Sequence, residues 1–185
     1  RGSVGVVYDA LDRELGRRVA LKVLRPGFDT DPAAVERFRS EARHCALVRH
    51  PSIVVVHEAG LAEGQHYYTM ERVEGHTLAS LVRGDRAPGL PAPPPLPALL
   101  RGLADVADAL GALHAATAVH RDVKPSNLMV QSDGRFVLAD FGLARTVDSV
   151  RMTRTGQMMG TLLYSSPEQV LGRRDAVDAR SDVYG

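Results

Sequence analysis

Residues 119–142, VHRDVKPSNLMVQSDGRFVLADFG, decide how the rest of the chain is interpreted. Two apolar runs flank Asp133 and Gly134, a residue pair typical of a tight turn between antiparallel strands. With these two as the turn residues, the register places Asn127 directly opposite Asp140. Cross-strand neighbours lie about 5 Å apart, so we expect an amide oxygen and a carboxylate to converge. Oxygen ligands at that spacing suit Mg²⁺. The alternative is a surface hairpin whose Asp and Asn side chains only cap turns.

The ordered pair HRDVKPSN and DFG resembles the catalytic loop and the metal-binding loop of protein kinases. The resemblance implies that Asp122 is the catalytic base and that Lys124 neutralises the transferred phosphate. It also implies that Asn127 and Asp140 are the Mg²⁺ ligands, and it places Met129 in the ATP site.

The composition is that of one ordinary globular domain. The chain has 185 residues and is 44% hydrophobic. Its formal net charge is +1, so the overall electrostatic potential does not favour binding to a nucleic acid or to a membrane surface. Cys45 is the only cysteine, which excludes an internal disulfide and indicates a reducing compartment. No apolar run approaches the roughly 20 residues of a membrane span.

Lysine is used sparingly. Arginine carries nearly all the positive charge, and the only lysines are Lys22 and Lys124. The only asparagine is Asn127. All three fall where the kinase resemblance requires them, and a compact ammonium is not equivalent to a planar guanidinium against a phosphate.

The N-terminal residues resemble part of the glycine-rich kinase loop G-x-G-x-x-G-x-V. Gly2 and Gly5 match its second and third glycines and Val7 matches its valine, while the first glycine would precede Arg1. Glycine lets backbone N–H groups approach phosphates closely. By itself this half-motif is also compatible with a plain β-hairpin.

Residues 19–24, VALKVL, predict a short buried strand with Ala20 and Lys22 on one face. The resemblance places Ala20 over the adenine and Lys22 on the phosphates. A buried ammonium needs an anionic partner. Residues 32–48 predict an amphipathic helix, and Glu41 lies on its apolar stripe. Glu41 therefore resembles the helix glutamate that pairs with the strand lysine, although Glu36 is a rival that lies off the stripe.

Residues 53–57 and 67–70 predict two further strands, followed by MERVEG at residues 70–75. This segment resembles the hinge between the kinase lobes. Met70 is then the gatekeeper, and the backbone of Glu71 and Val73 contacts adenine. The alternative is an ordinary strand end and turn.

Residues 84–97, GDRAPGLPAPPPLP, cannot form a helix or a central strand. They predict a surface connection between two helices, and a PxxP partner site is the alternative. Residues 98–115 then predict a long helix. Its expected buried stripe comprises Leu99, Leu103, Val106, Leu110 and Leu113.

Residues 143–165 form a long polar segment that resembles an activation loop, closed by Ser-Pro-Glu at residues 166–168. Arg121 precedes the predicted base, and a phosphate on the loop would give its guanidinium a partner. Thr153 and Thr155 are the preferred sites. Thr161 is expected to contact the catalytic loop instead. Asp182 is expected to anchor that loop from below.

We therefore expect an α+β, two-lobed protein-kinase-like fold that is incomplete at both ends. Residues 1–70 would form a small antiparallel sheet with one helix, residues 71–75 the hinge, and residues 76–185 the first part of a mainly helical lobe. The expected activity is transfer of the ATP γ-phosphoryl group to protein serine or threonine, with ATP, Mg²⁺ and a protein substrate as partners. A cytoplasmic location follows from the reducing compartment, although an anchor could lie outside these residues. A pseudokinase scaffold and a small-molecule phosphotransferase are the alternatives.

Overall fold

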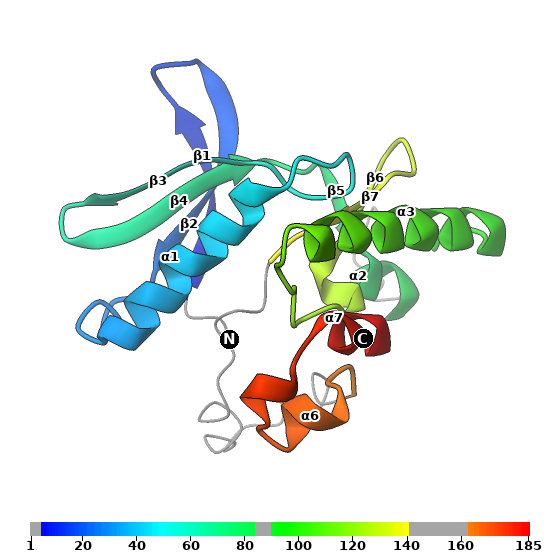
Figure 1. The fold of residues 1–185 in the computed structure, drawn as a ribbon. Helices are drawn as coiled ribbons and strands as arrows, with labels where there is room; N and C mark the ends of the chain where they lie inside the picture. Colours follow the sequence, from blue (N-terminus) through cyan, green and yellow to red (C-terminus); the bar gives the residue numbers. More distant parts are fainter. Residues whose placement is uncertain (1–4, 84–89, 141–162) are drawn as a thin grey trace.

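The computed structural model describes residues 5–83, 90–140 and 163–185. In chain order the elements are β1 (Gly5–Asp12), β2 (Arg17–Leu24), α1 (Pro32–Leu47), β3 (Val56–Ala62), β4 (Gln65–Glu71), β5 (Gly75–Thr77), α2 (Leu78–Arg83), α3 (Leu96–Ala115), η1 (Pro125–Asn127), β6 (Leu128–Gln131), β7 (Phe136–Leu138), α6 (Pro167–Val170), η3 (Arg174–Ala176) and α7 (Ala179–Tyr184). The main sheet and α1 form one part of the chain, and α2, α3 and α7 gather in another (Figure 1). The expected α+β arrangement, with an antiparallel sheet, one helix beside it and a more helical second part, is confirmed.

The main sheet has the strand order β1-β2-β4-β3, and all its pairs are antiparallel. Because β2 lies between two neighbours, its central residues are shielded on both sides. Lys22 is paired with Val7 on β1 and with Tyr68 on β4. The sheet therefore fixes the position of the one lysine in β2.

Helix α1 begins where its sequence predicts. The Asp31 carboxylate accepts a hydrogen bond from the Ala33 N–H at 2.9 Å, and Pro32 occupies the first turn. The helix buries one stripe, comprising Ala34, Phe38, Glu41, Ala42 and Cys45. Burying a side chain such as Phe38 contributes about 1.5–3 kcal/mol, so the stripe determines which face of α1 packs on the sheet.

The hairpin formed by β6 and β7 differs by one residue from the predicted register. Leu128 is paired with Leu138 and Val130 with Phe136, which places Asn127 opposite Ala139 rather than Asp140. The loop has three residues instead of two, and its last residue, Gly134, has a φ of 85°. Three-residue loops with a left-handed third residue are a common hairpin form, and they too select glycine at that place.

The predicted strand at residues 53–57 is displaced, since β3 begins only at Val56. Ile53 instead forms a parallel bridge with Leu138, and the Val54 N–H donates to the Leu138 carbonyl at 3.1 Å. The segment before β3 thus joins the β6–β7 hairpin, and Ile53 is buried in the same core cluster as Leu138.

Helix α3 begins at Leu96, two residues earlier than predicted, because Pro97 is tolerated in a first helical turn. Leu103, expected to be buried, is 39% exposed. The buried stripe instead includes Gly102, where an added Cβ would lie 2.4 Å from a ring carbon of Phe136. The missing side chain lets the helix approach the hairpin, which rotates the packed face away from Leu103.

No helix within the described ranges is both long and apolar enough to cross a membrane.

Candidate active site

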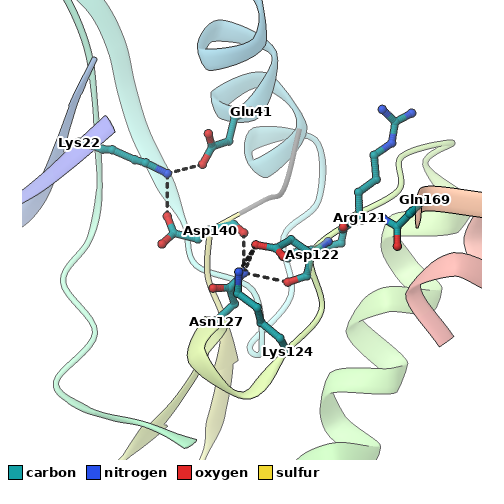
Figure 2. A network of polar contacts seen from close by, with 9 residues as sticks. Lys22, Glu41, Arg121, Asp122, Lys124, Asn127, Asp140 and Gln169 are labelled. Carbon is teal, nitrogen blue, oxygen red and sulfur yellow. Dashed lines mark hydrogen bonds and ion pairs between the residues drawn. The ribbon is translucent and has the colours of Figure 1, made fainter. Parts of the chain in front are cut away.

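The side chain of Lys22 is the centre of a buried ionic cluster. Its ammonium donates to Oε1 of Glu41 at 2.6 Å and to Oδ1 of Asp140 at 2.7 Å. The Tyr68 hydroxyl donates to the same Glu41 oxygen at 2.8 Å. Three segments of the chain therefore converge on one cation, and Figure 2 shows the two carboxylates meeting the ammonium. The expected pairing of Lys22 with Glu41 is present, whereas Glu36 pairs with Arg43 on the surface.

The charges of this cluster are tightly coupled. Burial alone would lower the pKa of Lys22, but the Asp140 and Glu41 carboxylates outweigh it and raise the pKa above its ordinary value. Lys22 is therefore a cation at neutral pH. Burial raises the pKa of Glu41, Lys22 opposes that rise, and the Asp140 charge adds to it. One ammonium shared by two carboxylates leaves negative charge uncompensated, which favours the binding of a second cation near Asp140.

Asp140 follows β7 in the left-handed conformation, with a φ of 55°. Such a φ is uncommon for a residue with a side chain and is often found at functional sites. The Asp140 side chain is 46% exposed, while Lys22 is 4% exposed. The turn therefore places one oxygen against a buried ammonium and leaves the carboxylate accessible to a ligand.

Asp122 lies in a second polar cluster close to the first. Its Oδ2 accepts from Nζ of Lys124 at 2.5 Å and from Nδ2 of Asn127 at 2.9 Å. Nδ2 of Asn127 also donates to the Asp122 carbonyl at 2.8 Å and to the Asp140 carbonyl at 3.2 Å. Asn127 thus links the two clusters, despite the register shift in the hairpin. The labelled side chains of Asp122, Lys124, Asn127 and Asp140 gather in one small region (Figure 2).

The donor set fits a hard divalent cation. The hydrogen bonds of the Asn127 amide within the described part of the chain run through Nδ2, which directs its donor side into the protein. The amide oxygen of Asn127 and the exposed carboxylate of Asp140 are the oxygen donors that Mg²⁺ prefers, and two protein ligands leave room for phosphate oxygens. Among the described residues no cluster of three or more His, Cys, Asp or Glu forms a metal site, so a metal here would depend on such a mixed set.

Asp182 holds the backbone that leads into Asp122. Its carboxylate accepts from the N–H of His120 at 2.8 Å and from the N–H of Arg121 at 2.7 Å. It is 2% exposed, and Nε2 of His114 lies 2.8 Å from its Oδ2. The expected anchoring by Asp182 is confirmed. His114 is not among the residues predicted from the motifs, although its place in the last turn of α3, four residues after buried Leu110, is a usable signal.

His120 is fully buried beside this anchor. Burial lowers the pKa of His120, and the Asp182 and Asp122 carboxylates oppose the shift. A neutral imidazole is consistent with Nδ1 accepting the Asp122 N–H at 3.3 Å. The ring therefore helps to orient the backbone of Asp122.

The residues assigned to the adenine side also lie together. Met70 is buried and paired with Ala20 across the sheet, and Val73 and Met129 pack against the same core cluster. The N–H of Glu71 donates to the Val55 carbonyl at 2.7 Å, so this N–H is not available to donate to a ligand. A backbone hydrogen bond between Glu71 and a ligand must therefore use the Glu71 carbonyl as the acceptor.

The phosphate side is described only from Gly5 onward. A Cβ added at Gly5 would lie 3.1 Å from Cγ of Lys22, so a larger residue would crowd the lysine stem. Val7 is 48% exposed and faces Lys22 as its strand partner. Gly2 and the predicted loop sites Thr153, Thr155 and Thr161 lie outside the described residues.

A family model for the protein kinase domain matches residues 1–185, which is the entire chain. The chain belongs to the protein kinase domain family. The residues that the sequence motifs single out, Lys22, Glu41, Asp122, Lys124, Asn127 and Asp140, lie in the two clusters described above.

This kinase domain has close relatives in mycobacteria. It is 45% identical over 188 residues to the serine/threonine-protein kinase PknA of Mycobacterium tuberculosis, and the match covers 99% of this chain and 42% of that protein. It is 42% identical to the serine/threonine-protein kinase PknB of Mycobacterium leprae, covering 99% of this chain and 29% of that protein. The chain thus spans less than half the length of these curated relatives.

Solved structures resemble the kinase domain as well. The PknI kinase domain of Mycobacterium tuberculosis is 31% identical with a TM-score of 0.70, and the match covers 98% of this chain and 65% of that one. The apo form of PpkA-294 has a TM-score of 0.77 at 23% identity, covering 100% of this chain and 68% of that one. The second likeness concerns the fold alone.

Proposed function

We propose that the protein is an ATP-dependent protein kinase that transfers the γ-phosphoryl group to serine or threonine hydroxyls of a protein. The observation that carries the proposal is the convergence of Asp122, Lys124 and Asn127 with the Lys22–Glu41–Asp140 cluster. The relatives named above are serine/threonine-protein kinases, which agrees with this activity.

In the proposed reaction a bond forms between the acceptor hydroxyl oxygen and the γ-phosphorus, while the bond between that phosphorus and the β,γ-bridging oxygen breaks and ADP leaves. Asp122 orients the hydroxyl and accepts its proton. Lys124, whose Nζ lies 2.5 Å from that carboxylate, would neutralise the transferred phosphoryl group. The acceptor oxygen and the phosphate would therefore meet beside this ion pair, within reach of both side chains.

Lys22 is proposed to hold the α- and β-phosphates, because Glu41 fixes the direction of its ammonium from the buried side. Gly2, Gly5 and Val7 would cover the phosphates, and Ala20, Met70, Val73 and Met129 would surround the adenine, with the backbone at Glu71 and Val73 reading its edge. Asn127 and Asp140 would hold Mg²⁺, which when bound neutralises negative charge on the phosphates.

We further propose that residues 1–70 act as the upper lobe, residues 71–75 as the hinge and residues 76–185 as the beginning of the lower lobe. Phosphorylation at Thr153 or Thr155 would recruit Arg121, whose exposed side chain points away from the Asp122–Lys124 pair (Figure 2). The segment would work in the cytoplasm, where ATP is available.

The test is transfer of radiolabel from γ-labelled ATP to a generic protein substrate by the full-length protein, followed by phosphoamino-acid analysis. Label on phosphoserine or phosphothreonine is expected. ATP binding without transfer would support a pseudokinase instead. Transfer to a small molecule but to no protein would favour the phosphotransferase alternative.

A further inference from the structure

Arg121, the residue before the proposed base, has a strained backbone. Its φ is 68°, in the left-handed region that residues with a side chain rarely adopt. Such a conformation persists only where its surroundings hold it. Both backbone polar groups of Arg121 are in fact held, each by a different C-terminal segment.

The N–H of Arg121 donates to Oδ1 of Asp182 at 2.7 Å. Its carbonyl accepts from Nε2 of Gln169 at 2.8 Å, across 48 positions of sequence. Gln169 reaches this carbonyl from α6, and Figure 2 shows its side chain beside Arg121. The second contact belongs to no motif used in the proposed mechanism.

The peptide that joins Arg121 to Asp122 is therefore fixed at both ends. Gln169 binds its carbonyl, and Nδ1 of His120 accepts its N–H at 3.3 Å. Rotation of this peptide plane changes the direction in which the Asp122 side chain leaves the backbone. A contact that resists the rotation thus helps to aim the Asp122 carboxylate.

The chemistry of the Gln169 side chain is determined by Ser166. The N–H of Ser166 donates to Oε1 of Gln169 at 2.9 Å, and the Ser166 hydroxyl lies 3.2 Å from the same oxygen. Since Ser166 is 1% exposed and caps α6, the amide oxygen is committed to the helix terminus. The amide nitrogen must then face Arg121, where only a donor satisfies the carbonyl.

We propose that Gln169 is a positioning residue for phosphoryl transfer, acting through the Arg121 carbonyl on the direction of Asp122. The inference rests on the proposed kinase function. Gln169 directly follows the Ser-Pro-Glu segment. Its role requires the N–H donor of the side-chain amide rather than a side chain of a particular size.

The matched variants are Gln169→Glu and Gln65→Glu in the full-length protein. In the first variant the new carboxylate is close in size to the amide and can still accept from the Ser166 N–H, but it cannot donate to the Arg121 carbonyl. The second variant makes the same amide-to-carboxylate change at an exposed position of β4 and leaves Gln169 unchanged. Three quantities are compared: kcat, the dissociation constant of ATP, and hydrogen exchange in a peptide covering residues 118–126.

For Gln169→Glu we expect kcat to fall about tenfold, the order that follows when one hydrogen bond positioning a reacting group is lost. The dissociation constant of ATP should stay within about twofold, because Gln169 lies apart from the Lys22 cluster, and exchange in residues 118–126 should accelerate selectively. Gln65→Glu should match the wild type in kcat and exchange.

Unchanged kcat and unchanged exchange in Gln169→Glu would overturn the proposal. So would a weaker ATP affinity together with faster exchange throughout the chain, since that pattern indicates general loss of structure. If the wild type transfers no phosphate, the kinase function fails, and selective exchange in residues 118–126 still decides whether Gln169 holds the loop.

Discussion

The ammonium of Lys22 lies 2.6 Å from Oε1 of Glu41, and the two side chains are only 4% and 3% exposed. They come from a central strand and from the inner face of a helix. Removing one partner from a buried ion pair leaves an uncompensated charge, so this contact should couple the stability of the sheet–helix packing to nucleotide binding.

Replacing Glu41 by glutamine should weaken both properties. We expect the free energy of unfolding to fall by about 1–3 kcal/mol, because a buried charged hydrogen-bonding group loses its best partner. ATP affinity should fall as well, since Glu41 would no longer fix the direction of the Lys22 ammonium from the buried side. Chemical denaturation and nucleotide titration measure the two effects.

Glu36→Gln is the matched control, because Glu36 pairs with Arg43 on the exposed side of the same helix. Exposed pairs contribute roughly 0–1 kcal/mol, so this variant should resemble the wild type. Equal losses in the two variants would contradict the role assigned to Glu41.

Asp122→Asn should reduce kcat about 10²–10⁴-fold, the usual contribution of a positioned general base. The dissociation constant of ATP should change little, because the proposed contact of Asp122 is with the acceptor hydroxyl. Steady-state kinetics and a nucleotide titration separate the two effects. Asp133→Asn, in the exposed hairpin loop, is the control, and a variant of Asp122 that lost ATP binding but kept kcat would refute the assignment.

Gly102→Ala should destabilise the protein. The added Cβ would lie 2.4 Å from a ring carbon of buried Phe136, and overpacking of this kind costs about 1–3 kcal/mol. Gly111→Ala lies on the same helix with nothing within 4 Å of the new Cβ, so it should stabilise the protein by about 0.5–1 kcal/mol through helix propensity. Thermal melts that ranked the two variants in the opposite order would show that α3 is packed on another face.

Protonation of His120 should make folding sensitive to acid. Burial lowers the pKa of His120 below its ordinary value of 6.5, so the unfolded chain binds more protons than the folded chain below that pH. The free energy of unfolding should therefore fall as the pH drops from about 6.5 towards 5. His57, whose pKa burial also lowers, contributes in the same direction.

In His120→Asn the slope of unfolding free energy against pH should be shallower over this range, with the His57 contribution remaining. Urea denaturation at several pH values measures the slope. An identical slope in the wild type and the variant would show that His120 does not account for the acid sensitivity.

Phosphate is expected on Thr155, Thr153 or both after the full-length protein is incubated with ATP. The modification would supply an anion for Arg121, and the double alanine variant should be less active. Mass spectrometry and the radiolabel assay give the two readouts. The control is Thr146→Ala, a threonine of the same segment that lies closer in sequence to the DFG motif. Full activity of the double variant, without phosphate on the loop, would exclude this switch.

The amino-acid sequence alone determined the residues of the proposed site, because their identity and spacing are local properties. The apolar neighbours of Lys22 indicate that its ammonium is buried, and a buried ammonium requires an anionic partner. The helical stripe that contains Phe38 also contains Glu41. The order of the two motifs at residues 119–142 likewise places Asp122, Asn127 and Asp140 within a short stretch of chain. None of these inferences needs distant contacts.

Only the tertiary structure decided the hairpin register, the packed face of α3 and the support of the catalytic loop. A two-residue and a three-residue loop both place glycine at position 134, so the choice depends on how β7 packs against Ile53 and α3. Gly102 is buried because a ring from a distant strand lies against it. The hydrogen bonds of the Arg121 backbone with Asp182 and with Gln169 join residues that are 61 and 48 positions apart. Such pairs carry no periodic signal, because they arise from the way whole segments pack together.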